Sequence, residues 1–306
     1  MSQPSLAVRL GGLELKNPVL PASGTYGYGR EYLPFFTPDV LGAVVTKGVA
    51  LKPWPGNPPP RIYETPAGML NAIGLQNPGV AHFVAEAIPF LRQYQTPVIV
   101  NIVGKTIDEY AAVAGILSGY PEISGFELNI SCPNVKEGGI AFGTDPEMAA
   151  AVTAAVRKAT RRPLIVKLSP NVTDITSIAV RVAEAGADAL SLTNTLLGMA
   201  IDIRKRRPVL GNTVGGLSGP AIKPVALRMV WQVYQKVSIP IIGMGGIHSA
   251  TAALEFIMAG ATAVAIGTAL FQDPLAPVRV IAGIRDFLSE EGISDVTDLI
   301  GVAHQS

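Results

Sequence analysis

Short runs of consecutive apolar residues, rich in Val, Ile, Leu and Ala, recur along the chain. Runs of roughly four to eight such residues, bounded by Gly, Pro or polar residues, are typical of strands buried on both faces of a parallel sheet. We therefore predict eight strands, at Pro18–Ala22, Ala43–Thr46, Val98–Ile102, Gly125–Ile130, Leu164–Leu168, Ala189–Thr193, Ile239–Gly243 and Ala263–Gly267.

The segments between these runs mix apolar and charged residues at helical spacing. Asp145-Pro146-Glu147 has the residues of a helix start, namely a capping carboxylate, a proline at the first helical position and an acid in the first turn. Gly186 and Gly260 follow helical segments, as expected of C-terminal stops. The predicted helices are Val80–Tyr94, Ile107–Ser118, Asp145–Thr160, Thr173–Ala185, Lys223–Lys236 and Ser249–Met258.

This alternation predicts an α/β fold, a (β/α)8 TIM barrel with long insertions on its C-terminal, active-site face. An open doubly wound sheet is the alternative. We favour the barrel because there are eight strands and polar residues end nearly all of them. Val49 to Gly79 and Leu196 to Pro220 are long connections, which we interpret as lids or binding surfaces. No linker divides the chain, so residues 1–306 are expected to form a single domain.

Composition limits the classes of function. The net charge of +1 does not favour nucleic acid or an anionic membrane. Mean hydropathy is high, at +0.36, yet no window approaches the roughly 20 apolar residues that span a bilayer. We also see no secretory signal in Met1 to Gly12. The single cysteine excludes an intrachain disulfide and an iron–sulfur cluster built from this chain alone, and it is compatible with a cytoplasmic location.

That one cysteine lies in Asn129-Ile-Ser-Cys-Pro-Asn134, directly after a predicted strand. The strand end therefore brings together a thiol, two amides and a hydroxyl. A thiol that loses its proton is a base or nucleophile, and amides can both donate to and accept from a flat heterocycle. The alternative is that Cys132 is simply a small buried hydrophobe.

Two further features at strand ends indicate an anionic ligand. Gly245-Gly246 precedes a predicted helix and Gly267-Thr268 follows the eighth strand, positions at which barrels often bind phosphate. The phosphate can belong to a substrate or to flavin mononucleotide (FMN), although tight turns alone also require glycine. Lys47 and Lys167 follow strands, where they either stabilise a negative ligand or reach solvent.

Other chemistries have no matching pattern. His82, His248 and His304 lack a metal-ligand spacing, so no metal site is predicted. The chain has neither a P-loop nor a nucleophile elbow. Gly243-Met-Gly-Gly246 is not a dinucleotide fingerprint, so we do not expect this chain to bind a nicotinamide cofactor directly.

Six segments carry a resemblance to a known family, namely Asn129–Asn134, Thr46-Lys-Gly48, Asn71-Ala-Ile-Gly-Leu-Gln-Asn77, Val166-Lys-Leu-Ser169, Gly215-Gly-Leu-Ser-Gly-Pro220 and Gly245-Gly-Ile247. Together these segments resemble the dihydroorotate dehydrogenase family nearly end to end. With a cysteine at position 132 the chain resembles class 1 of that family, and the segments Ser23–Gly29 and Asn71–Asn77 most resemble the NAD-linked subclass 1B catalytic subunit.

The resemblance implies an FMN oxidoreductase that converts dihydroorotate to orotate in de novo pyrimidine biosynthesis. Cys132 matches the base, on a loop at Pro133 to Gly143, and FMN accepts the hydride. The implied substrate contacts are Lys47, Asn71, Ala72, Ile73, Gly74, Leu75, Asn129, Asn134, Asn194 and Thr195. The implied FMN contacts are Ser23, Lys47, Gly48, Asn101, Asn129, Lys167, Thr193, Gly219, Gly245, Gly246, Gly267 and Thr268.

For subclass 1B the resemblance also implies a homodimer core with an electron-transfer subunit, a heterotetramer in which the partner carries FAD and a 2Fe-2S cluster and reduces NAD⁺. Three alternatives remain open at this point. They are the fumarate-linked subclass 1A, a related FMN barrel such as a dihydropyrimidine reductase, and a non-catalytic barrel that binds a phosphorylated metabolite.

Overall fold

The computed structural model describes residues 3–130 and 142–305. Its main sheet has eight parallel strands in the order β3-β16-β15-β10-β9-β8-β7-β4. The backbone N–H of Gly42, just before β4, donates to the carbonyl of Val19 in β3 at 2.9 Å and closes the sheet into a barrel. The strands are β3 (Val19–Pro21), β4 (Val44–Val45), β7 (Val98–Ile102), β8 (Ile123–Asn129), β9 (Leu164–Lys167), β10 (Ala189–Leu192), β15 (Ile241–Met244) and β16 (Ala263–Ile266).

All eight predicted strands are therefore confirmed, and the barrel is favoured over the open sheet. The strand residues are buried almost throughout, because the barrel interior covers one face and the helices cover the other. A short hairpin of β1 (Val8–Leu10) and β2 (Leu13–Leu15) precedes the barrel. Its turn residue Gly11 lies against Asp188, at the amino end of β10, so the hairpin covers the end of the barrel opposite the strand tips.

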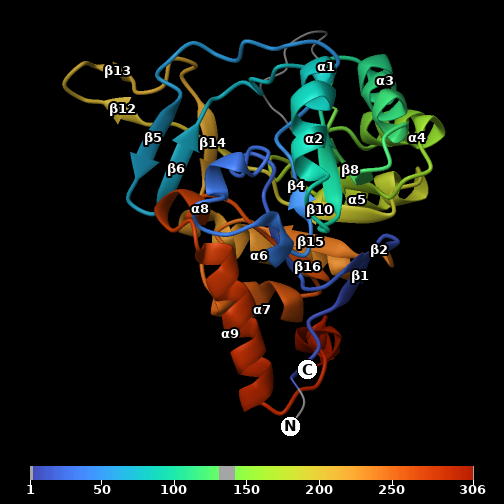
Figure 1. The fold of residues 1–306 in the computed structure, drawn as a ribbon. Helices are drawn as coiled ribbons and strands as arrows, with labels where there is room; N and C mark the ends of the chain where they lie inside the picture. Colours follow the sequence, from blue (N-terminus) through green and yellow to red (C-terminus); the bar gives the residue numbers. More distant parts are fainter. Residues whose placement is uncertain (1–2, 131–141, 306) are drawn as a thin grey trace.

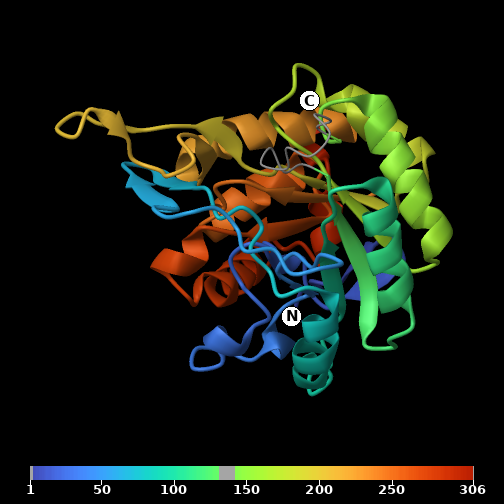
Figure 2. The ribbon, with the colours of Figure 1, turned by 90° about the horizontal axis from the view of Figure 1, so that it is seen from above.

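Helices surround this sheet, with α3, α4 and α5 along one side (Figures 1 and 2). The predicted cap of α4 is confirmed, since the Asp145 carboxylate accepts from the backbone N–H of Met148 at 2.8 Å. The first helical segment contains a π-helical stretch at Phe83–Ala87. The α-helices are α1 (Val80–His82), α2 (Ile88–Leu91), α3 (Ile107–Ser118), α4 (Pro146–Ala159), α5 (Ile175–Glu184), α6 (Lys223–Tyr234), α7 (Ala250–Met258), α8 (Ala269–Gln272) and α9 (Ala276–Glu290).

The two long connections form structure of their own. Together they build an antiparallel sheet in the order β11-β14-β6-β5, which projects from one side of the barrel with the β12–β13 hairpin at its tip (Figure 1). Strands β6 and β14 pair in register, with Asn71 opposite Gly216. The strands are β5 (Ile62–Thr65), β6 (Gly68–Asn71), β11 (Leu196–Gly198), β12 (Ile201–Asp202), β13 (Arg207–Pro208) and β14 (Gly215–Ser218).

The projecting sheet has a small core of Leu70, Ala72 and Leu210, separate from the barrel core. Across the two described ranges, none of the helices combines the length and apolar character needed to cross a membrane.

Candidate active site

A cavity of about 290 Å³ lies at the carboxyl ends of the barrel strands, with the projecting sheet as one wall. Eighteen of the residues predicted as substrate or flavin contacts line it. They are Ser23, Lys47, Gly48, Asn71, Ile73, Gly74, Leu75, Asn101, Asn129, Lys167, Thr193, Asn194, Thr195, Gly219, Gly245, Gly246, Gly267 and Thr268. Residues from all parts of the chain therefore meet at one place, as the barrel requires.

Three predicted residues are not among those that line the cavity. Cys132 and Asn134 lie outside the described residues, as does most of the predicted loop 133–143. Ala72 is described, but it is 1% exposed and packs in the small core with Leu70 and Leu210. The side chains of a strand alternate between its two faces, so Met69 and Asn71 face the cavity while Leu70 and Ala72 face away from it.

The floor of the cavity carries buried polar side chains. Lys167, at the end of β9, is only 4% exposed. Its Nζ donates to Ser23 Oγ at 3.3 Å and lies 3.9 Å from Glu127 Oε2. The Asn101 amide donates to the same carboxylate oxygen at 2.6 Å. A cation and an amide are thus held in fixed positions under the cavity, where they can bind an electron-rich ring.

One end of the cavity is built from glycines and helix starts. Gly245 and Gly246 have φ of 125° and 78°, which favours glycine. A Cβ on Gly246 would lie 2.8 Å from the carbonyl oxygen of Gly219, so the backbone is closely packed here. Helix α7 begins just beyond, capped by Ser249, whose Oγ accepts from the Ala252 N–H at 3.2 Å. Backbone N–H groups and a helix dipole at this end suit a phosphate group.

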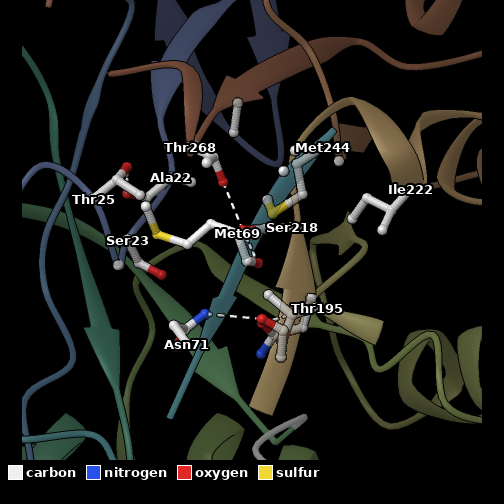
Figure 3. A pocket seen from close by; sticks show the side chains of 18 of the residues that line it. Ala22, Ser23, Thr25, Met69, Asn71, Thr195, Ser218, Ile222, Met244 and Thr268 are labelled. Atoms are coloured by element: carbon white, nitrogen blue, oxygen red, sulfur yellow. Dashed lines mark hydrogen bonds between the residues drawn. The ribbon is translucent and has the colours of Figure 1, made fainter. Parts of the chain in front are cut away.

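Threonine and serine link this end to the projecting sheet. Thr268 Oγ1 donates to Ser218 Oγ at 2.7 Å (Figure 3). Ser218 was not predicted as a site residue, although it lies in the segment Gly215–Pro220 that carries part of the resemblance. The same figure shows Met69 and Met244 in the pocket, two apolar lining residues that were not predicted. They give the cavity a partly apolar wall, as a flavin or pyrimidine ring needs.

The opposite wall presents amides. The Asn71 amide donates to the carbonyl of Gly216 at 3.3 Å across the β6–β14 pair. Asn171 holds the neighbouring segment, since its amide donates to the carbonyl of Thr195 at 3.0 Å and its Oδ1 accepts from the Leu197 N–H at 2.8 Å. A side chain at Gly216 would overlap the Thr195 hydroxyl. The polar groups of this wall are therefore tightly positioned.

Two tyrosines in the segment Ser23–Gly29 support the Ser23 end of the site. Burial raises the pKa of Tyr28 to about 12 and raises the pKa of Tyr26 as well. Both phenols are therefore neutral near pH 7 and contribute their rings. Tyr26 stacks on Tyr32 with centroids 4.9 Å apart, and Tyr28 meets Phe83 edge to face. This packing fixes the loop that carries Ser23 at the cavity.

A known protein family matches most of the chain. The family model described as dihydroorotate dehydrogenase matches residues 5–288. The chain belongs to the dihydroorotate dehydrogenase family. The resemblance seen in the sequence is therefore confirmed.

Two curated relatives carry the name of one subclass of the family. The chain is 60% identical over 301 residues to a protein of Geotalea daltonii named dihydroorotate dehydrogenase B (NAD(+)), catalytic subunit, covering 98% of this chain and 99% of that protein. A protein of Pelobacter propionicus with the same name is 61% identical over 299 residues, with 98% of each chain covered.

A solved structure supports the fold. The structure of DHODH from Eimeria tenella in complex with ferulenol superposes with a TM-score of 0.82 at 25% identity, covering 98% of this chain and 89% of that one. The predicted α/β TIM-barrel fold is thus confirmed by the strand order and by a member of the family.

Proposed function

We propose that this chain is the catalytic subunit of an NAD-linked dihydroorotate dehydrogenase, which oxidises dihydroorotate to orotate in de novo pyrimidine biosynthesis. The observation that carries the proposal is the cavity itself. It brings two lysines, several asparagines and a glycine-lined helix start to one rim of the barrel. The curated relatives named above are NAD-linked, which favours this subclass over the fumarate-linked one.

The residues present fit FMN as the bound cofactor. The helix start at Gly245-Gly246 offers backbone N–H groups to a phosphate, and Gly219, Gly267 and Thr268 lie at the same end. Lys167 and Asn101 would meet the ring at the cavity floor, with Ser23, Gly48 and Thr193 around it. When bound, FMN supplies the two-electron acceptor that no side chain of this chain can provide.

The substrate contacts follow from the chemistry of orotate, which is planar, has amide-like edges and bears one carboxylate. Asn71, Asn129 and Asn194 can donate to and accept from such edges. Lys47 would offset the carboxylate. Ile73, Gly74, Leu75 and Thr195 complete the wall.

Cys132 is the proposed base that removes a proton from the substrate carbon. It follows Asn129 by three positions, and Asn129 ends β8 at the cavity. The Tyr110 hydroxyl donates to the Asn129 carbonyl at 2.9 Å and fixes the carboxyl end of β8. Asn134 is proposed as a further amide near the pyrimidine.

One cysteine cannot hold an iron–sulfur cluster, so electrons must leave this chain through a partner or a soluble acceptor. We propose an electron-transfer subunit that carries FAD and a 2Fe-2S cluster, bound to a homodimer of this single-domain chain. Exposed apolar side chains on and near the projecting sheet support an interface there, among them Ile62, Leu197, Met199, Ile201 and Ile203, the last 83% exposed. A cytoplasmic location is part of the proposal, since a single free cysteine suits a reducing compartment.

The test is the absorption spectrum of the purified chain before and after dihydroorotate is added. Bound flavin that bleaches on addition of substrate supports the proposal, and a colourless protein that takes up no FMN would refute it. An acceptor assay then separates the subclasses. Robust turnover of the isolated chain with fumarate would favour subclass 1A over subclass 1B with its electron-transfer subunit.

A further inference from the structure

Glu127 is a buried acid inside the barrel for which the sequence analysis gave no role. It stands in β8 between Phe126 and Leu128, and its residue is 1% exposed. Its hydrogen-bond and charge partners lie on β7, β9 and β10, so its side chain points into the barrel interior. An acid buried to this extent is costly unless it is paired and hydrogen-bonded.

Each oxygen of the carboxylate has a partner. Oε2 accepts from the Asn101 amide at 2.6 Å and lies 3.9 Å from the ammonium of Lys167. Oε1 accepts from Ser191 Oγ at 2.9 Å. Ser191 and Asn101 are both fully or almost fully buried, so the carboxylate is held from two sides and cannot swing away from the lysine.

The ion pair is oriented relative to the cavity. Lys167 lines the cavity, whereas Glu127 is not among its lining residues. The ammonium also donates at 3.3 Å to Ser23 Oγ, and Ser23 itself lines the cavity. The pair therefore presents its positive end to the cavity and keeps its negative end below the floor.

We propose that Glu127 is a positioning residue, whose carboxylate holds the Lys167 ammonium at the cavity floor and offsets its charge, thereby setting the reduction potential of the bound flavin. The proposal rests on the proposed function, because it needs FMN in the cavity. Reduction adds electron density to the ring, which a nearby cation favours and a nearby anion disfavours. Both charges act through a poorly solvated interior, where such effects are strong.

The experiment measures the FMN midpoint potential and the FMN dissociation constant of the full chain and three variants, Glu127→Gln, Lys167→Met and the double variant. We expect the highest midpoint potential in Glu127→Gln, followed by the wild type and the double variant, and the lowest in Lys167→Met. Loss of the carboxylate should favour binding of reduced over oxidised FMN by about tenfold. For a two-electron couple that is about 30 mV.

The double variant also keeps the test possible if a single variant fails to fold. Removing both members of a buried ion pair is better tolerated than removing one. Should Glu127→Gln not fold, Lys167→Met and the double variant still differ only at residue 127, which is a glutamate in the first and a glutamine in the second. The potential of the double variant should be the higher, because it lacks the carboxylate.

Asp188→Asn is the matched control, because it also converts an ion-paired acid to its amide. Asp188 pairs with Arg157 at 2.7 Å just before β10, at the other end of the barrel, and the potential should not change. Equal potentials with and without the Glu127 carboxylate, in both backgrounds, would overturn the proposal even if the variants melt earlier. A wild-type chain that binds no FMN would instead overturn the proposed function, and this inference with it.

Discussion

Ser218 and Thr268 share a hydrogen bond of 2.7 Å between their hydroxyls, although 50 positions separate them in the chain. Ser218 ends β14 of the projecting sheet, and Thr268 follows β16 of the barrel. The bond therefore joins the cavity wall to the barrel rim beside the glycine-rich end of the site.

Thr268→Val should weaken FMN retention, because the valine keeps the shape but loses this bond. A neutral hydrogen bond contributes about 0.5–1.5 kcal/mol, so we expect the FMN dissociation constant to rise roughly 2- to 10-fold. Fluorescence titration of the apoprotein with FMN measures it. Thr153→Val is the control, since Thr153 donates within α4, to the Ala149 carbonyl, and does not line the cavity. An equal rise of the FMN dissociation constant in both variants would contradict a specific role for the hydrogen bond between Thr268 and Ser218.

Cys132→Ser should slow flavin reduction by dihydroorotate by roughly 10²–10⁴-fold near neutral pH, because a hydroxyl is a poorer base than a thiolate. Stopped-flow absorbance of the bound flavin under anaerobic conditions measures this step directly. FMN content should stay at the wild-type level. If reduction proceeds at the wild-type rate, the base is another group.

Lys47→Ala should weaken orotate binding, because a charge-assisted hydrogen bond to the carboxylate is lost. Such bonds contribute about 1.5–3 kcal/mol, so the orotate dissociation constant should rise roughly 10- to 150-fold, as read from the flavin spectrum. Lys52→Ala is a suitable control because Lys52 is exposed and does not line the cavity. Similar constants for the two variants would show that Lys47 reaches solvent instead.

Asp174→Ala should destabilise the fold in a pH-dependent way. Asp174 caps α5, and hydrogen bonds from the Thr176 side chain and backbone hold the pKa of its carboxyl below the usual value. A lowered native pKa stabilises the fold above the unfolded pKa of about 3.9, and this stability is lost as pH falls through the native value. We expect a loss of about 1 kcal/mol at neutral pH that shrinks below about pH 4, measured as the difference in urea midpoints. A difference that is constant with pH would point to helix propensity alone.

The barrel could be predicted because its signal is local. Each of the eight strands is a continuous apolar run, and Asp145 marks a helix start by itself. The projecting sheet could not be predicted in the same way. Its strands are short, several of their residues are exposed, and β6 pairs with β14 across 145 positions. Nothing in the local sequence of either long connection indicates that β6 and β14 pair with each other.

Most of the residues predicted for the site line one cavity, because polar residues at strand ends must meet in a barrel. Ala72 is not among them, because successive residues of a strand face opposite sides and a sequence motif does not show which side each residue faces. Glu127 was missed, although a lone acid between Phe126 and Leu128 in a buried run was a usable signal. A charge in such a place needs a partner, and the lysine at the end of the next strand was available.

The close packing at Gly216 limits how members of this family can diverge. Any side chain at position 216 would collide with Thr195 and lie 2.6 Å from its Cβ, while the carbonyl of Gly216 accepts from Asn71 on the facing strand. Substitution at position 216 is therefore constrained by the residue at position 195. Homologues that carry a larger residue at 216 should also differ at 195, and those pairs would mark lineages whose cavity has changed shape.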